Sequence, residues 1–441
     1  VNYGYADKYI LTATMRADGS SRFGENNKYG YFPSVALGWN IDKEGFMQDN
    51  SMFSILKLRA SWGQTGNQDG IPSKVSLASF LDSRLDFDTY PIGGDETSLA
   101  DYPFGTVPAR TAFPDLQWEV ATTINIGLDF GMFQNKLSGT LDYFSKVTSD
   151  VVNFSNRTDP IQPTEKIWTN LEGMEIKNNG IELALDYRGN FTEDFTYNIG
   201  GNFTYTDNSV QNSPFAVITT GSAQGAGQTG ATINGYINDE PIGAFFMKEF
   251  IGIGADGRNI FTDVVADGES LDNDRIIAGS ALPDILYAFY LKFNYKDFDL
   301  GFNFNGVSGN KIYNHTAMSL FSRGQLARSL NTTPFAVEFD NEIDTNSNEV
   351  STRYLEDGSF LRLNNATLGY TLRAENVGLG DWVNSLRLTL TGQNLFVISD
   401  YSGFDPEGNT GATIDGIQTF GIDRFTYPSP RTLLVGLNVK F

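Results

Sequence analysis

Apolar and polar residues alternate strictly along many stretches of this chain. In residues 298–305, which read FDLGFNFN, every second residue is large and apolar, and the residues between are polar or small. Because successive side chains of a β-strand point to opposite faces, this period of two predicts a strand with one apolar and one polar face. Residues 287–295 show the same alternation, and the intervening Lys296 and Asp297 predict a tight hairpin turn.

The same pattern recurs along the rest of the chain and predicts about twelve strands in all. The further stretches are residues 11–15, 35–41, 56–62, 124–130, 137–143, 181–187, 195–205, 366–372, 386–390 and 433–441.

The predicted connections between these strands alternate in length. Short turns lie at 131–136, 189–194 and 296–297, and long segments lie at 66–116, 149–179, 207–285, 307–359 and 396–431. Outer-membrane β-barrels have short periplasmic turns and long external loops, so the alternation favours such a barrel. We assign residues 241–251, which also read like a strand, to an external loop.

Hydropathy leaves two classes of protein open. The mean hydropathy is −0.26, and no run approaches the roughly 20 apolar residues of a membrane helix. The chain is therefore either soluble or crosses a membrane as strands. A soluble all-β protein would also alternate, but Asn, Thr, Gly, Ser and charged residues on the opposite faces suit a watery barrel lumen.

Composition removes most catalytic chemistry and nucleic-acid binding. Cysteine is absent, and His315 is the single histidine, so thiolate metal sites, Cys nucleophiles and His-centred triads are excluded or nearly so. We expect His315 to be an exposed loop residue. The net charge of −22 argues against nucleic acid as a partner, because phosphate binding needs clustered Lys and Arg. No carboxylates are paired as acid and base, and we expect no enzymatic activity.

Six segments of the chain resemble the SusC/RagA family of TonB-linked outer-membrane transporters. They are RADGSSRFGENNKYGYFPSVALGWNI (16–41), LKLRASWGQTGNQ (56–68), NNGIELALDY (178–187), GSFLRLNNATLGYTL (358–372), LTGQNLFVISDYSGFDPE (390–407) and TYPSPRTLLVGLNVKF (426–441). Their order and spacing resemble the C-terminal half of that family.

The resemblance implies an all-β fold, an antiparallel transmembrane barrel of about 22 strands in the cell outer membrane. Residues 1–441 would supply about the last 12 strands, with the plug domain and the N-terminal strands outside this chain. The implied partners are TonB, reached through the missing N-terminal region, and a SusD-like surface lipoprotein.

The resemblance also implies active import of an oligomeric nutrient, with glycan favoured over peptide as the substrate. Two alternatives stay open. A passive porin or a structural outer-membrane barrel would explain the polar faces equally well, and a secreted adhesive β protein would be soluble without detergent.

One acidic stretch, residues 261–275, is a candidate calcium loop. Asp263, Asp267, Glu269 and Asp274 fall at positions 1, 5, 7 and 12 of such a loop. Position 3 is Val265, and position 12 lacks the usual bidentate Glu. A solvated acidic turn is therefore the alternative, and we expect no other cofactor.

Aromatic residues of the long segments are candidate ligand contacts, because flat apolar faces suit sugar rings or peptide side chains. The alternative is that they pack the loops together. The candidates are Tyr90, Tyr102, Phe113 and Trp168.

Three further patterns carry weaker expectations. Gly436, Val439 and Phe441 match part of the C-terminal signal read by barrel-insertion machinery. Residues 252–257 match GxGxxG, but no helix signal follows, which argues against a nucleotide site.

The basic residues of the polar strand faces would contact a plug or a ligand. They are Lys57, Arg59, Arg16, Lys292, Arg362 and Arg387.

Overall fold

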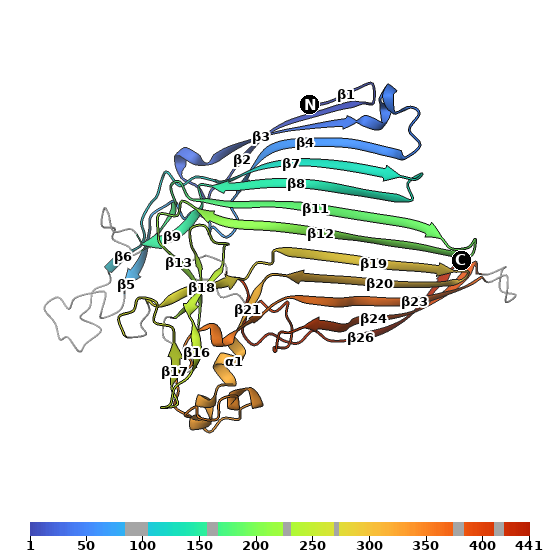
Figure 1. Cartoon of the computed structure of the whole chain (residues 1–441). Coiled ribbons are helices and arrows are strands. Elements are labelled where there is room, and N and C mark those ends of the chain that lie inside the picture. The colour runs from blue at the N-terminus through green and yellow to red at the C-terminus, as the bar shows by residue number, and fades with distance from the viewer. Residues whose placement is uncertain (84–104, 157–165, 224–230, 269–272, 374–382, 410–418) are drawn as a thin grey trace.

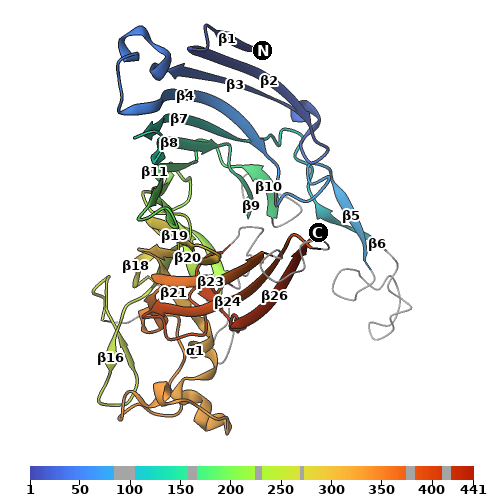
Figure 2. The same ribbon diagram turned by 90° about the vertical axis from the view of Figure 1, so that its right-hand side faces the viewer.

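The structure is a computed structural model, and it describes residues 1–83, 105–156, 166–223, 231–268, 273–373, 383–409 and 419–441. Its main element is a 13-stranded sheet in the order β1-β2-β3-β4-β7-β8-β11-β12-β19-β20-β23-β24-β26. Neighbours in this order pair antiparallel throughout. The sheet curves into an open trough with β1 and β26 at its two edges (Figures 1 and 2).

The strands of this sheet are β1 (Asn2–Tyr5), β2 (Tyr9–Gly19), β3 (Tyr29–Asn40), β4 (Phe53–Asn67), β7 (Glu119–Met132), β8 (Leu137–Ser149), β11 (Glu175–Asn190), β12 (Phe195–Gln211), β19 (Ile285–Tyr295), β20 (Phe298–Ser308), β23 (Phe360–Arg373), β24 (Ser385–Ser399) and β26 (Thr432–Lys440). All the strands predicted from the alternation are confirmed. The sheet also holds β1, which the alternation did not predict. Its four residues are too few to show a period of two.

Strand register gathers like residues into lateral rows that cross the sheet. One row is apolar and exposed, and it joins Leu37, Ala60, Ile126, Tyr143, Ile181 and Tyr205. The adjacent row faces the other way and joins Arg59, Gly127, Asp142, Glu182 and Thr204. Ile126, Tyr143 and Ile181 are still 45–49% exposed. A continuous exposed apolar band of this kind is unfavourable in water and suits contact with lipid.

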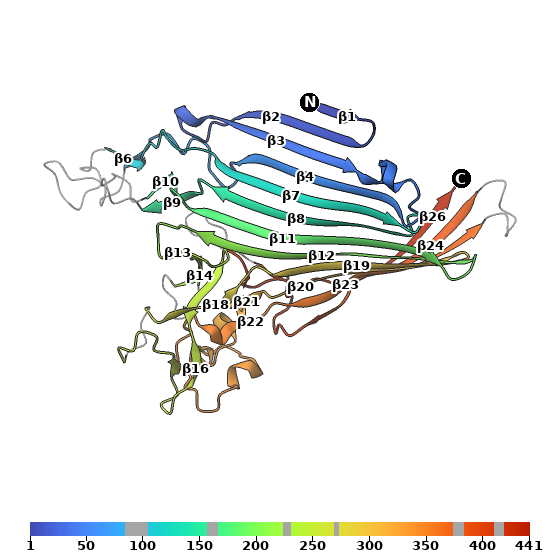
Figure 3. The ribbon, with the colours of Figure 1, turned by 45° about the horizontal axis from the view of Figure 1, so that its top comes forward.

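Connections at the two ends of the sheet differ in size, as the sequence predicts. At one end the strands are joined through residues 6–8, 41–52, 133–136, 191–194, 296–297 and 374–384. At the other end they are joined through residues 20–28, 68–118, 150–174, 212–284, 309–359 and 400–431. Figures 1 and 3 show that the long connections gather beyond one end of the trough.

The long connections contain their own short strands and helices. These are β5 (Ser79–Ser83), β6 (Gly105–Arg110), β9 (Val152–Asn156), β10 (Lys166–Asn170), β13 (Ile218–Ser222), β14 (Thr232–Tyr236), β15 (Ala244–Lys248), β16 (Phe250–Ile253), β17 (Asn259–Phe261), β18 (Arg275–Ser280), β21 (Lys311–Asn314), β22 (Leu355–Asp357), β25 (Ile422–Asp423) and α1 (His315–Leu320). The 3-10 helices of the described residues in these connections are η1 (Glu25–Asn27), η5 (Arg323–Arg328), η6 (Pro334–Val337) and η7 (Thr352–Tyr354), whereas η2 (Ile41–Lys43) and η3 (Gly45–Met47) lie in the connection 41–52 at the opposite end. Residues 241–251 hold β15 and the start of β16, within a loop as expected.

None of the helices in the described ranges has the length and apolar character needed to span a bilayer.

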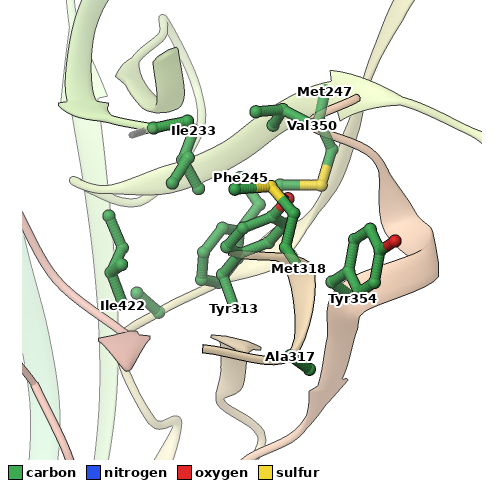
Figure 4. Packing of buried hydrophobic residues seen from close by; sticks show 11 residues of the cluster. Ile233, Phe245, Met247, Tyr313, Ala317, Met318, Val350, Tyr354 and Ile422 are labelled. Atoms are coloured by element: carbon green, nitrogen blue, oxygen red, sulfur yellow. The ribbon is translucent and has the colours of Figure 1, made fainter. Parts of the chain in front are cut away.

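Three of the long connections share one apolar core. We call the described residues of 212–284, 309–359 and 400–431 the cap. Figure 4 shows its core, with Phe245 from one connection, Tyr313 and Met318 from the second, and Ile422 from the third. All four side chains are at most 3% exposed. Burying apolar surface from all three connections binds them into one folded unit.

A second core joins two other connections, 20–28 and 68–118, to β3. It consists of Phe23, Phe32, Ile71, Val75, Leu116 and Trp118, all buried. The Phe23 and Trp118 rings lie 4.5 Å apart between centroids. The external ends of β2, β3, β4 and β7 are thereby packed together.

Candidate functional site

The polar face of the trough carries ion pairs that join neighbouring strands. Arg59 of β4 donates from Nη2 to Asp129 of β7 at 2.8 Å and to Asp142 of β8 at 3.1 Å. Gly127 lies between Arg59 and Asp142 in one lateral row of the sheet. A Cβ at Gly127 would approach an Asp142 carboxylate oxygen to 2.3 Å. The guanidinium therefore occupies space that only glycine leaves open.

Further pairs neutralise other charges along this face. Arg387 donates to Asp299 at 2.6 Å, and Arg188 donates to Asp186 at 2.8 Å. Asp186 also accepts the hydroxyl hydrogen of Tyr290. Arg59 and Arg387, expected to contact a plug or a ligand, are thus held by carboxylates of the chain itself.

Neutral amides and hydroxyls fill much of the rest of the polar face. The Asn303 side-chain amide donates to the Asn365 side-chain oxygen Oδ1 at 2.6 Å, and the Thr367 and Thr391 hydroxyls lie 2.9 Å apart. Such groups both donate and accept hydrogen bonds without carrying charge.

A depression of about 610 Å³ lies along the wall, lined by residues from β4 to β23. Small side chains in one lateral row make room for it, and this row runs through Thr140, Ala184, Asn202, Ala288 and Asn305. Its lining also includes the polar groups of Asp129, Asp186 and Tyr290. Apolar residues such as Phe130, Leu185 and Phe289 complete the lining, so the wall is hollowed rather than flat, with a lining of mixed polarity.

An ion pair fastens the cap to the external end of the wall. Arg362 of β23 donates to Asp405 of the cap at 2.5 Å and pairs with Glu407 at 2.9 Å. Burial alone would raise the pKa of Asp405, but the Ser429 hydroxyl, the Glu407 N–H and Arg362 lower that pKa below its ordinary value. Asp405 is thereby kept ionised beside Arg362, so the contact stays a charged one.

Comparison with known proteins decides the family. The family model described as "TonB dependent receptor-like, beta-barrel" matches residues 1–395. This chain belongs to that family. Its members lie in the outer membrane, so the exposed apolar band of this receptor barrel faces lipid, and the polar face lines the lumen.

Relatives of this receptor barrel include two bacterial receptors. It is 32% identical to "TonB-dependent receptor P3" of Formosa agariphila, over 100% of the chain and 45% of that protein. It is 29% identical to "TonB-dependent receptor SusC" of Bacteroides thetaiotaomicron, over 100% of the chain and 43% of that protein. The chain thus spans a little under half the length of these relatives, and the resemblance to SusC is confirmed.

A solved structure shares the fold of this receptor barrel. The "RagAB peptide importer in the 'closed-closed' state" superposes with a TM-score of 0.82 at 24% identity, over 100% of this chain and 47% of that one. At this identity the match shows the fold alone. Together with the family model, it confirms that the 13-stranded sheet is part of a larger antiparallel β-barrel.

The acidic turn of the receptor barrel brings three predicted metal ligands together. Carboxylate oxygens of Asp263, Asp267 and Asp274 all lie within 4.8 Å of one another. Asp274 is fully buried, and its Oδ1 accepts the N–H groups of Val264 at 2.9 Å and Val265 at 3.0 Å. Three carboxylates fit the oxygen ligands that Ca²⁺ prefers. Glu269 lies outside the described residues, and calcium binding stays a prediction.

The candidate ligand-binding aromatics divide into two groups. Tyr90 and Tyr102 lie outside the described residues. Phe113 and Trp168 are partly buried and pack against the core around Trp118, and Trp168 also stacks on Phe154 with centroids 5.3 Å apart. Loop packing therefore accounts for the positions of Phe113 and Trp168, and contact with a ligand stays a prediction for all four.

His315 is not the exposed loop residue that the sequence suggested. It is fully buried as the first residue of α1, and its Nδ1 lies 3.0 Å from the Ser319 hydroxyl. Burial, together with the nearby Arg424, lowers the pKa of His315 to about 4. The expectation was wrong because its helix is only six residues long and gains its burial from the cap core. The following Ala317 and Met318 were the only local signal.

The GxGxxG match proves to be a hairpin. Residues 254–258 turn between β16 and β17, which pair with each other, so no helix follows the glycines. Gly252 and Gly257 have φ of 149° and 81°, and positive φ values favour glycine. Backbone conformation therefore explains two of the three glycines of the motif. The argument against a nucleotide site is confirmed in this respect.

The insertion-signal residues lie at the end of the last strand. Gly436 pairs with Thr389 in β24, and a Cβ at Gly436 would meet the Thr389 hydroxyl oxygen at 2.6 Å. Val439 and Phe441 are 36% and 83% exposed. Their role as a signal stays a prediction.

Proposed function

We propose that the full-length protein imports an oligomeric nutrient across the outer membrane, driven by TonB and working with a SusD-like surface lipoprotein. The observation that carries the proposal is the two-sided wall, with an apolar face for lipid and a polar hollowed face for a lumen, in a chain of the TonB-dependent receptor family. TonB contact is assigned to the part of the protein outside this chain.

The chemistry of the wall supports a neutral substrate, and we favour glycan over peptide. Arg59, Arg387 and Arg188 are each neutralised by carboxylates within the wall, and amides and hydroxyls lie between these pairs. Sugar hydroxyls match these amide and hydroxyl partners, whereas the charged termini of a peptide would find these arginines already paired. The proposed role is transport without bond cleavage.

Uptake by energised cells tests this proposal. Cells that express the full-length protein with its neighbouring lipoprotein would receive labelled neutral oligosaccharides and labelled oligopeptides of similar mass. We expect saturable oligosaccharide uptake that stops when a protonophore removes the inner-membrane gradient. Uptake that continues without the gradient would instead indicate a passive porin, and uptake of peptides alone would overturn the glycan assignment.

A further inference from the structure

We propose that a pocket in the cap binds a single neutral sugar ring. The pocket has a volume of about 280 Å³ and lies between α1 and the connection that follows β24. Its lining includes Asn314, Thr316, Phe321, Thr333, Phe404 and Asp423. The proposal rests on the proposed import of glycan, for which the pocket would be a contact outside the lumen.

Size selects a small ligand. Pockets for drug-sized ligands span roughly 300–1,000 Å³, so about 280 Å³ suits one ring rather than an extended oligomer. A longer glycan would place one ring in the pocket and continue beyond it.

Two aromatic rings from different connections line the pocket. Phe321 follows α1, and Phe404 follows β24 and is 65% exposed. An apolar ring that stays exposed beside polar groups suits a ligand with one apolar face, as the C–H face of a sugar provides. We therefore expect the ligand to stack its apolar face on these rings. A charged group of a ligand would find no favourable contact with them.

A strained residue beside the pocket fixes one of its hydroxyls. Phe425 has φ of 57°, a left-handed conformation that is unfavourable for a bulky side chain. In this conformation its N–H donates to the Thr316 hydroxyl oxygen at 2.7 Å. Thr316 also donates to the Asp423 backbone carbonyl at 3.3 Å, which holds α1 against β25. The surrounding structure maintains this conformation through the two hydrogen bonds of Thr316.

The polar groups of the pocket can serve hydroxyls that both donate and accept. The Thr333 hydroxyl oxygen is buried, and no atom of the described residues hydrogen-bonds to it. The Asp423 carboxylate is 2% exposed and accepts the Tyr401 hydroxyl at 2.6 Å and the Thr426 N–H at 3.2 Å. Each carboxylate oxygen can accept a further hydrogen bond. A sugar hydroxyl would satisfy Thr333, and another would donate to Asp423.

Charge argues against an anionic ligand. Among the described residues that line the pocket there is no Lys or Arg, and the one charged group is Asp423. An amino-acid side chain of a peptide is the competing occupant, and the test below separates it from a sugar.

The test measures ligand binding to the purified full-length protein in detergent by saturation-transfer NMR. The probes are methyl glycosides of glucose, galactose, mannose and xylose, and N-acetyl amides of leucine, phenylalanine and lysine. We expect at least one glycoside to bind. Phe404→Ala should weaken its affinity by roughly ten-fold or more through lost stacking. Thr333→Val should weaken it by roughly three- to ten-fold through one lost hydrogen bond.

Two variants control for folding and for position. Phe404→Trp keeps a stacking ring and should retain binding. Tyr427→Ala removes another exposed aromatic ring, 84% exposed and outside the pocket lining, and should leave the affinity unchanged. The absence of any glycoside signal that depends on Phe404 overturns the proposal, as does a Phe404-dependent signal from the amino-acid amides alone.

Failure of the pocket and failure of import give different results. If glycoside binding depends on Phe404 but uptake does not require the inner-membrane gradient, the pocket stands and active import fails. If gradient-driven glycan uptake occurs while glycoside affinity is the same in Phe404→Ala, import stands and the pocket fails.

Discussion

The Arg353 guanidinium lies 2.7 Å from a carboxylate oxygen of Glu342, and the two side chains are 5% and 2% exposed. The guanidinium carbon also lies 5.1 Å and 5.2 Å from the ring centroids of Phe250 and Phe339. This pair joins η7 to the segment before it and to β16. It is therefore a buried charged contact inside the cap.

Arg353→Met should destabilise the cap, because Glu342 would be left buried without its partner. Breaking one side of a buried ion pair costs about 3–5 kcal/mol. Hydrogen exchange of residues 334–357 and 250–261 would report the change as faster exchange at neutral pH. The matched control is Arg258→Met, whose pair with Asp256 at 4.0 Å has side chains 69% and 67% exposed and is worth less than about 1 kcal/mol. Equal effects from the two variants would contradict the importance assigned to the buried pair.

Gly127→Ala should destabilise the barrel wall, since the new Cβ would lie 2.3 Å from an Asp142 oxygen and 2.6 Å from an Arg59 nitrogen. Moving the ion pair aside should cost about 1–3 kcal/mol. The shift from folded to unfolded migration on unboiled gels, measured against temperature, would show a lower midpoint. Gly301→Ala is the control, because nothing lies within 4 Å of a Cβ there. A midpoint unaltered by Gly127→Ala would show that Arg59 can shift freely.

Acid should loosen the cap through His315. Its pKa is lowered to about 4 by burial and by Arg424, from an ordinary value of 6.5. Between these two pH values the unfolded state binds more protons, so stability falls as the pH drops from about 6.5 towards 4 and levels off below that. Protection factors of the α1 amides at pH 7 and pH 5, each taken relative to the intrinsic exchange rate at that pH, measure this. In His315→Gln the contribution should vanish, so an unchanged pH dependence in that variant would assign it to other groups.

The predicted calcium site can be tested on the acidic turn itself. If Asp263, Asp267 and Asp274 hold Ca²⁺, adding the ion should slow amide exchange across residues 261–275, and a chelator should reverse the effect. Asp267→Asn should remove the response, whereas Asp256→Asn, in the neighbouring hairpin with a side chain 67% exposed, should keep it. Identical exchange with and without calcium would leave a solvated acidic turn.

Much of the wall could be predicted from local pattern. The alternation in residues 298–305 was sufficient to place β20 and to say which of its faces is apolar, because a period of two is a property of neighbouring residues. The acidic turn could also be found, since Asp263 and Asp267 lie close in the sequence. The pocket around Phe404 could not, because its lining comes from connections about 90 residues apart that only the folded cap brings together.

The sequence by itself determined twelve of the thirteen strands of the main sheet, the apolar face of each, and the alternation of short and long connections. Only the tertiary structure decided which charges meet. Arg59 reaches Asp129 and Asp142 across separations of 70 and 83 residues, because the register of β4, β7 and β8 aligns them. It also decided that His315 is buried, since three distant connections must pack together before their apolar residues leave water. Periodicity is local, whereas register and loop packing depend on contacts between segments far apart in the chain.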